Sequence, residues 1–229
     1  MKYFSFVKAN SRFLAFGLLM ALFSSFGQTY FIALFSAELR TVFSLSHGGF
    51  GSIYAAATLA SGLCVIWLGR KIDQVDLRVY AALVCGGLIL GCFFMAAVPS
   101  AALLYLSIFA MRLTGQGLMS HTSVTSMARY FEGERGKAVS IAALGFPAGV
   151  AVFPLIGVAL NRVLGWRGAW TAIGTVLALA LIPIILWLLK GHGERHRRLL
   201  KRAAGGETSA ALTIRQWTRR EVLRDSRFY

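Results

Sequence analysis

Long uninterrupted runs of apolar residues, rather than alternating apolar and polar positions, set the pattern of this chain. Each run is close to the ~20 residues that a helix needs to cross the hydrocarbon core of a bilayer. Barrel strands are shorter and alternate strictly, so helices are expected instead. The six runs are residues 13–35, 49–68, 79–98, 101–128, 138–160 and 168–189. The pattern predicts an all-α integral membrane protein, with a six-transmembrane-helix bundle over residues 1–190 and a separate tail over 191–229.

Basic residues cluster in the segments between alternate runs. The chain has 24 Lys and Arg against 9 Asp and Glu, a net charge of +15. With the N-terminus inside, each inner segment carries three basic residues, whereas the outer loops hold only Arg40, Arg162 and Arg167. Because Lys and Arg favour the cytoplasmic side, we predict a multi-pass protein of the plasma (cell) membrane with both termini cytoplasmic. These charges flank the runs and form no aromatic-interleaved patch, so the expected partner is the lipid bilayer and not nucleic acid.

The tail changes composition sharply after Leu189. Its first part is basic and contains small residues, which is typical of a cytoplasmic linker. Residues 213–229 contain a capping-box pattern, Thr218 with Glu221 three residues later. This favours a short amphipathic helix at the membrane surface, with Trp217 at the interface. A disordered basic tail is the alternative.

Arg112 is a charged residue near the middle of an apolar run. It lies eleven residues into the fourth run, about 16 Å deep in a core about 30 Å thick. An arginine at that depth costs at least a few kcal/mol unless it faces a partner or water. At 100° per residue, Gln116, Ser120 and Ser123 fall within about 80° of it. We predict a polar stripe that faces a cavity; the alternative is a packing arginine bonded to backbone carbonyls.

Other polar residues in the runs offer further candidates. Gln28 and Tyr30, in the stretch Ser24–Tyr30 of the first run, could contact a polar substrate or bond between helices. His121 falls on the opposite side of the fourth run from Arg112, so we expect it to pack against a neighbouring helix, with a proton relay as the alternative. No run carries Asp or Glu. A positive Arg112 without an acidic partner favours an anionic ligand.

The fifth run combines prolines with glycines. Each proline removes an intrahelical hydrogen bond, and each glycine permits close helix approach. The pattern predicts a closely packed helix that can kink, with a mechanical role. The residues concerned are Gly145, Pro147, Gly149, Pro154 and Gly157.

Residues for metal, cofactor or enzyme chemistry are not evident. Cys64, Cys85 and Cys92 lie inside apolar runs without CxxC or Cys/His spacing, and are interpreted as small buried residues. Cys85 and Cys92 are seven positions apart and so share a helix face. An intramembrane protease is not expected because no G-x-S-G occurs and the sixth run lacks His. We predict no enzyme activity, no metal site and no cofactor.

The loop between the second and third runs resembles the signature of the major facilitator superfamily of transporters. That signature reads Gly-x-x-x-Asp, two residues, then Gly and a basic pair; Gly69 and Asp73 match, and Arg78 takes one basic position. Asp76 stands where the second glycine is usual and Leu77 where the first basic residue is usual. The resemblance implies that the loop with Gly69, Asp73 and Arg78 helps gate the inner side, and that Asp73 helps hold helix ends together and stabilises the outward-open state.

Three further stretches resemble the same family in the expected order. They are Arg112 with Gly115-Gln116-Gly117 in the fourth run, Ala128–Ala138 before the fifth, and Gly145-xxx-Gly149 with Pro154-xx-Gly157 in the fifth. The resemblance implies the N-terminal half of the family fold, a 3+3 inverted repeat. In that fold, two six-helix halves bind substrate between them at midmembrane.

The resemblance implies a secondary active transporter working by alternating access, present as a half-length chain. We expect a small organic anion as substrate, with drug or metabolite efflux as the alternative. The expected cavity residues are Gln28, Tyr30, Arg112, Gln116 and Ser120. The chain's end, which looks like the approach to a seventh span, indicates a missing C-terminal half or a pairing with a second copy. A non-transporting membrane fragment is the remaining alternative.

Overall fold

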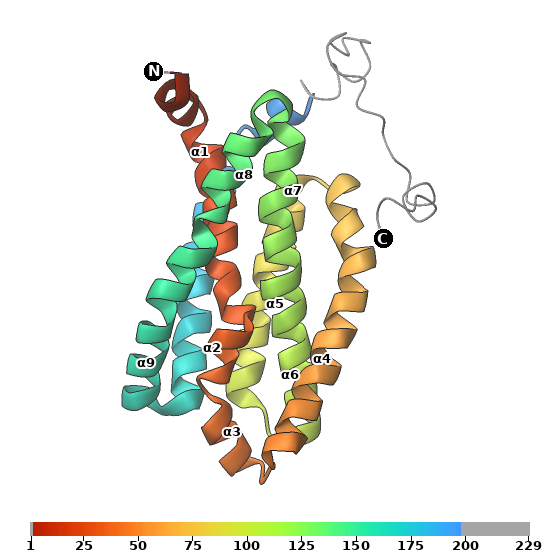
Figure 1. Ribbon diagram of the computed structural model, residues 1–229, viewed down its shortest axis with the longest axis vertical. Helices are drawn as coiled ribbons and strands as arrows, with labels where there is room; N and C mark the ends of the chain where they lie inside the picture. Colours follow the sequence, from red (N-terminus) through yellow and green to blue (C-terminus); the bar gives the residue numbers. More distant parts are fainter. Residues whose placement is uncertain (1, 198–229) are drawn as a thin grey trace, which may run out of the picture. The chain divides into compact units, whose positions relative to one another are not determined.

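The computed structural model describes residues 2–197, and every element in that part of the chain is a helix (Figure 1). Residues up to His192 form one compact unit. Five segments are long and apolar enough to cross a membrane, namely Tyr3–Ala33, His47–Asp73, Leu77–Ala97, Ala101–Tyr130 and Arg135–Leu188. The fold is therefore an all-α membrane bundle, as predicted. The amphipathic helix expected over residues 213–229 lies outside the described residues.

The first segment is a broken helix rather than the continuous one expected over residues 13–35. Its elements are α1 (Lys2–Phe23), the 3₁₀ turn η1 (Ser24–Gly27), α2 (Thr29–Ala33) and α3 (Ser36–Val42). Between η1 and α2, Gln28 is extended at φ −78° and ψ 154°. The Ser24 hydroxyl donates to the carbonyl of Ala21 at 2.7 Å, a local bond that competes with the helical ladder. The consequence is a set of backbone carbonyls near residue 27 that need donors from elsewhere.

Side-chain caps mark where the next helices begin. The elements are α4 (His47–Leu68), the 3₁₀ turn η2 (Gly69–Asp73) and α5 (Leu77–Ala97). Ser46 Oγ accepts from the amide of Gly49 at 3.0 Å, and Asp76 Oδ1 accepts from the amide of Arg78 at 2.8 Å. Asp76 thus caps the N-terminus of α5, at the position where the family signature has glycine.

The fourth segment contains a π-helical stretch. It runs through α6 (Ala101–Met111), the π-helix η3 (Arg112–Met119) and α7 (Ser120–Tyr130). A π-helix bonds i to i+5 and so turns more slowly than an α-helix, and such stretches are frequent at functional sites. The angles used to predict the stripe below Arg112 assumed a regular α-helix, and they do not hold across η3.

The last segment folds back on itself. Its elements are η4 (Glu132–Glu134), α8 (Arg135–Ala143), α9 (Gly145–Val176), the π-helix η5 (Leu177–Leu181) and α10 (Ile182–Leu188). As a straight helix the 54 residues would reach about 81 Å, far beyond a bilayer core. Gly165 reverses the chain at φ 65° and ψ 171°, a backbone conformation that glycine adopts most easily. The two arms run in opposite directions in Figure 1.

The interruption in the fifth predicted run lies just before the first of its two prolines. Helix α9 continues through Pro154, whereas the break between α8 and α9 falls at Leu144. Pro147 lies three residues after that break and cannot donate a backbone hydrogen bond into the preceding turn. The break therefore precedes Pro147 rather than lying at Pro154.

Glycines on α9 allow it to lie directly against the first segment. A Cβ at Gly145 would stand 2.3 Å from the carbonyl oxygen of Leu18, and one at Gly149 would stand 2.0 Å from Ser25 Oγ. A Cβ at Gly157 would meet the Phe31 ring at 3.0 Å. Side chains at these positions would force the two helices apart.

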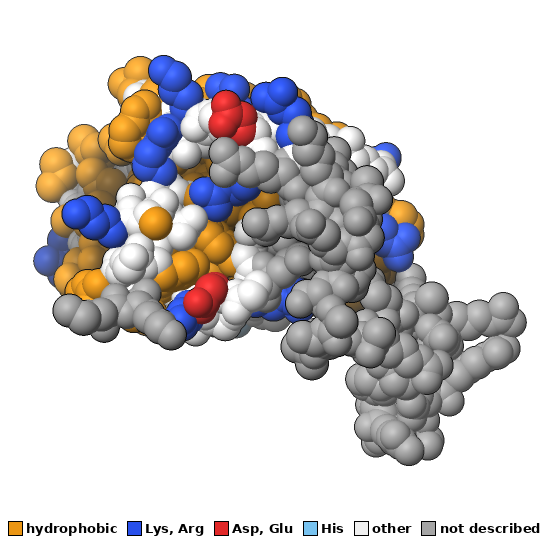
Figure 2. Space-filling model, turned by 90° about the horizontal axis from the view of Figure 1, so that it is seen from above, with side chains coloured by type: hydrophobic (Ala, Val, Ile, Leu, Met, Phe, Trp, Pro, Cys, Tyr) orange, Lys and Arg blue, Asp and Glu red, His pale blue; other side chains and the backbone are white. Residues whose placement is uncertain are grey.

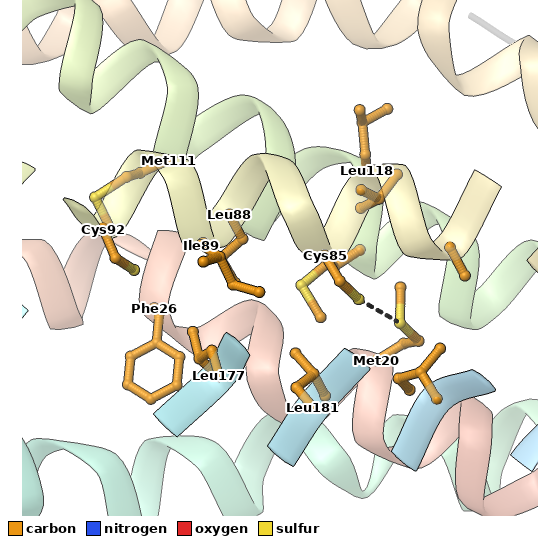
Figure 3. Close-up of a cluster of buried hydrophobic side chains, with 14 of the residues drawn as sticks. Met20, Phe26, Cys85, Leu88, Ile89, Cys92, Met111, Leu118, Leu177 and Leu181 are labelled. Atoms are coloured by element: carbon orange, nitrogen blue, oxygen red, sulfur yellow. Dashed lines mark hydrogen bonds between the residues drawn. The ribbon is translucent and has the colours of Figure 1, made fainter. Parts of the chain in front are cut away.

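The buried core lies between α1, α5 and the last segment. Cys85 of α5 faces Met20 of α1, with a 3.8 Å contact between their sulfur atoms, and Leu181 of η5 lies beside them (Figure 3). All three cysteines are free thiols, and Cys85 and Cys92 are buried. This packing fixes α5 behind the first segment, on which the candidate site is built.

Basic side chains gather at the end of the bundle where α1 begins. Figure 2 looks down on that end and shows Lys and Arg around its rim, with fewer acidic groups. The loops that contain η2 and η4 lie at the same end (Figure 1).

Candidate functional site

The guanidinium of Arg112 lies inside the bundle, at the break in the first segment. Only 6% of the residue is exposed. Its Nη1 donates to the carbonyl of Gly27 at 3.3 Å and to Thr29 Oγ1 at 3.1 Å. Its Nε donates to Thr58 Oγ1 at 3.1 Å. The side chain therefore joins three membrane segments through acceptors that carry no charge.

An aromatic ring completes the enclosure of Arg112. The Tyr54 ring lies 5.3 Å from the central carbon of the guanidinium, a cation–π distance. The Tyr54 hydroxyl donates to Thr29 Oγ1 at 2.9 Å. Tyr54 and Thr58 are four residues apart on α4, so both face the site. Thr29 is itself exposed, so the site is accessible from one side.

Two glycines bring the fourth segment close enough for these bonds. A Cβ at Gly27 would stand 2.2 Å from the carbonyl oxygen of Met111, and one at Gly115 would stand 2.7 Å from the Cα of Gly27. Both obstacles are backbone atoms, which cannot rotate away. The helices therefore touch backbone to backbone beside Arg112, which brings its guanidinium within reach of Gly27 and Thr29.

One nitrogen of the guanidinium remains available. Arginine carries five N–H donors and stays protonated in proteins. Nη2 makes no hydrogen bond within residues 2–197, and no carboxylate in that part of the chain is paired with Arg112. A buried cation with unused donors is suited to an anion, and most directly to a carboxylate.

The other residues predicted for the cavity make no hydrogen bond with Arg112. Gln116 Oε1, Ser120 Oγ and Tyr30 Oη are buried and have no hydrogen-bond partner among the described residues. Gln28 is half-buried and contributes the extended residue of the break. Ser123, also predicted for the stripe, donates instead to the carbonyl of Gly17 at 2.6 Å.

Sequence reasoning did not single out Thr29, Tyr54 and Thr58. Thr29 lies within a polar stretch that was noticed, but its hydroxyl is not distinguished there from its neighbours. Tyr54 and Thr58 are polar positions four residues apart in a largely apolar helix. That spacing, which places both on one face, is the signal that could have identified them.

His121 packs against the turn at the end of α4. A Cβ at Gly69 would lie 3.4 Å from the imidazole Cε1, an ordinary contact distance. The ring Nε2 shares a 3.3 Å hydrogen bond with Thr125 Oγ1. The imidazole thus lies beside the turn between α4 and α5 and makes no hydrogen bond with Arg112.

An ion pair holds the loop between α4 and α5. Arg129 Nη1 donates to Asp73 Oδ1 at 2.8 Å and to the carbonyl of Ile72 at 3.4 Å. Arg78, the basic residue of the loop signature, is exposed and forms no ion pair within residues 2–197. Asp73 is therefore joined to Arg129 at the end of α7, and not to Arg78 five positions later.

A carboxylate beyond the end of the first run also bonds between helices. Asn161 Nδ2 of α9 donates to Glu38 Oε1 of α3 at 2.6 Å. The second oxygen of Glu38 is buried without a hydrogen-bond partner among the described residues. Counting acidic residues only within the apolar runs missed this group. Within the same part of the chain, His, Cys, Asp and Glu form no cluster suited to a metal ion.

The family model of the Major Facilitator Superfamily matches residues 17–229, a range that includes the break in the first segment, Arg112 and the Asp73 loop. The chain belongs to this superfamily. It is therefore a multi-pass membrane protein of a transporter family, and it sits in a lipid bilayer.

Two curated proteins are similar to part of this chain. The chain is 30% identical over 152 residues to monocarboxylate transporter 6 of Mus musculus, covering 64% of this chain and 31% of that protein. It is 30% identical over 151 residues to monocarboxylate transporter 6 of Homo sapiens, covering 63% of this chain and 29% of that protein. The chain thus aligns with about a third of the length of these relatives. No solved structure matches it at a significant level.

Proposed function

We propose that this chain forms one half of a secondary active transporter that moves a small organic anion, a carboxylate, across the plasma membrane by alternating access. The observation that carries the proposal is the buried guanidinium of Arg112, which has an unused nitrogen and no acidic partner in the described chain. The names of the two relatives, both monocarboxylate transporters, support a carboxylate as the ligand class.

The proposal assigns different tasks to the middle and to one end of the fourth segment. At its middle, Arg112 attracts the carboxylate, while the buried oxygens of Gln116 and Ser120 can satisfy further polar groups of a ligand. At its end, the pair of Asp73 with Arg129 holds the loop that gates the inner side. The close α1–α9 contact through Gly145 and Gly149 keeps the half rigid as it moves.

The orientation belongs to the proposal as well. The basic rim in Figure 2 supports a cytoplasmic position for that end of the bundle, because Lys and Arg favour the cytoplasmic side, and we propose that both termini face the cytoplasm. Moving the substrate across the membrane requires no covalent step, so no enzyme activity is proposed. A second half, from another chain or a second copy, would complete the cavity beside Thr29 and α4.

The test measures ligand binding and uptake separately. L-lactate binding to the chain in lipid nanodiscs is measured by calorimetry, with lactamide as the uncharged analogue. We expect lactate and not lactamide to bind, and Arg112→Gln to abolish binding because the carboxylate loses its cation. Arg129→Gln removes the same charge at the loop and should leave binding intact.

Two results would contradict the proposal. Lactate binding that survives Arg112→Gln unchanged would remove the assigned role of the guanidinium. Uptake of labelled lactate is then followed in proteoliposomes that contain this chain, with and without its second half. Binding without uptake in both preparations would refute transport and favour a non-transporting membrane protein.

A further inference from the structure

A guanidinium can hold both oxygens of a carboxylate along either of two edges. The end-on edge uses Nη1 and Nη2, and the side-on edge uses Nε and Nη2. In Arg112, Nη2 belongs to both edges and is unused in the described chain, whereas Nη1 and Nε already donate. A carboxylate that binds with both oxygens must therefore displace an acceptor that the protein itself supplies.

The two edges differ in how strongly they are occupied. Nη1 donates to two acceptors, Gly27 and Thr29, and Thr29 is fixed in turn by the hydroxyl of Tyr54. Nε donates to one acceptor, the hydroxyl oxygen of Thr58. That hydroxyl makes no other hydrogen bond within residues 2–197. The acceptor on the side-on edge, Thr58, is thus held by no second side-chain hydrogen bond in the described chain, whereas Thr29 is held by Tyr54, so a ligand displaces Thr58 more easily.

We propose that Thr58 is the affinity-setting residue of the site, because its hydroxyl competes with the ligand carboxylate for Nε of Arg112. Thr29 has the opposite role: it anchors Nη1 and keeps the side-on edge directed at the ligand. This inference rests on the proposed carboxylate function of Arg112 and names the residue that regulates it.

The competition connects ligand binding to a helix. Thr58 lies on α4, and its bond to Arg112 joins α4 to the fourth segment across 54 positions of sequence. The α4 segment is the least buried of the five, with 11% of its apolar window buried against 33–56% in the others. When the carboxylate takes Nε, α4 loses this polar contact while keeping the Tyr54–Thr29 bond. Binding therefore loosens α4 relative to the fourth segment.

The experiment compares three isosteric variants by calorimetric titration of L-lactate in nanodiscs. Thr58→Val removes the competitor, so we expect lactate to bind about tenfold more tightly, equivalent to about 1.4 kcal/mol. Thr29→Val removes the anchor and should weaken lactate binding. Thr114→Val is the matched control, because that hydroxyl bonds to its own helix at the carbonyl of Ala110 and not to Arg112.

A conservative variant separates competition from a merely structural role. Thr58→Ser keeps the hydroxyl and should restore the affinity of the unmodified chain, and Thr58→Ala replaces Thr58→Val if the latter fails to fold. Unchanged or weaker lactate binding in Thr58→Val and Thr58→Ala, with Arg112 still required, overturns the inference but not the proposed function. Absence of lactate binding in every form of the chain, the unmodified one included, overturns both.

Discussion

Replacing Gly27 with alanine tests whether backbone contact between the first and fourth segments supports the Arg112 site. The added Cβ would stand 2.2 Å from the carbonyl oxygen of Met111 and 2.7 Å from the amide nitrogen of Gln116. Ordinary contact begins at 3.4 Å, so the two helices must separate by about 1.2 Å. The Arg112–Gly27 bond, already 3.3 Å long, would then exceed hydrogen-bond distance.

The expected loss combines two effects. Overpacking a close contact costs about 1–3 kcal/mol, and losing a hydrogen bond to a charged group costs about 1.5–3 kcal/mol. We therefore expect Gly27→Ala to lower the free energy of unfolding by about 3–5 kcal/mol. Lactate affinity should fall as well, because Arg112 loses part of its anchor.

The free energy of unfolding is measured by reversible titration with sodium dodecyl sulfate in mixed micelles. Gly62→Ala is the control, because a Cβ at Gly62 meets nothing within 4 Å and alanine is the better helix former by about 1 kcal/mol. Gly115→Ala should resemble Gly27→Ala, since its Cβ would stand 2.7 Å from Gly27 Cα. If the free energy of unfolding of Gly27→Ala equals that of Gly62→Ala, the assigned backbone contact is wrong.

Two further substitutions test the polar contacts at the bundle ends. Asp73→Asn removes the ion pair with Arg129, but 59% of the Asp73 side chain is exposed, so stability should fall by no more than about 1 kcal/mol. In Asp73→Asn, a spin label in the loop should nevertheless gain mobility. In the control Asp76→Asn, which keeps the helix cap, the mobility of the label should not change. Equal mobility in both variants would contradict a role for the ion pair. Asn161→Leu leaves Glu38 without its donor and should cost about 1–3 kcal/mol in the same unfolding titration, and an unchanged unfolding free energy would count against that bond.

Much of the architecture follows from the sequence because burial of apolar residues in lipid is a local property. Runs of about twenty apolar residues predict crossing helices whatever their neighbours are. The family resemblance was equally local, since each motif lies within about a dozen consecutive residues. Arg112 was identified in the same way, from its depth in a run and the cost of burying a charge there.

The partners of those residues were not predictable from local pattern. The Arg112 guanidinium bonds to residues 54 and 83 positions away, and Glu38 bonds to a residue 123 positions away. Asp73 pairs with Arg129 on α7, whereas the signature drew attention to Arg78. Such pairings depend on which faces meet when helices pack.

Backbone irregularity is the second feature that required the tertiary structure. The break at Gln28 and the π-helix at Arg112–Met119 alter the direction of every side chain that follows, so angles counted at 100° per residue fail there. The sequence by itself determined that this chain crosses a membrane as helices and carries a buried cation at midspan. Only the tertiary structure decided which groups that cation bonds, because those bonds form where two irregular helices touch at Gly27 and Gly115.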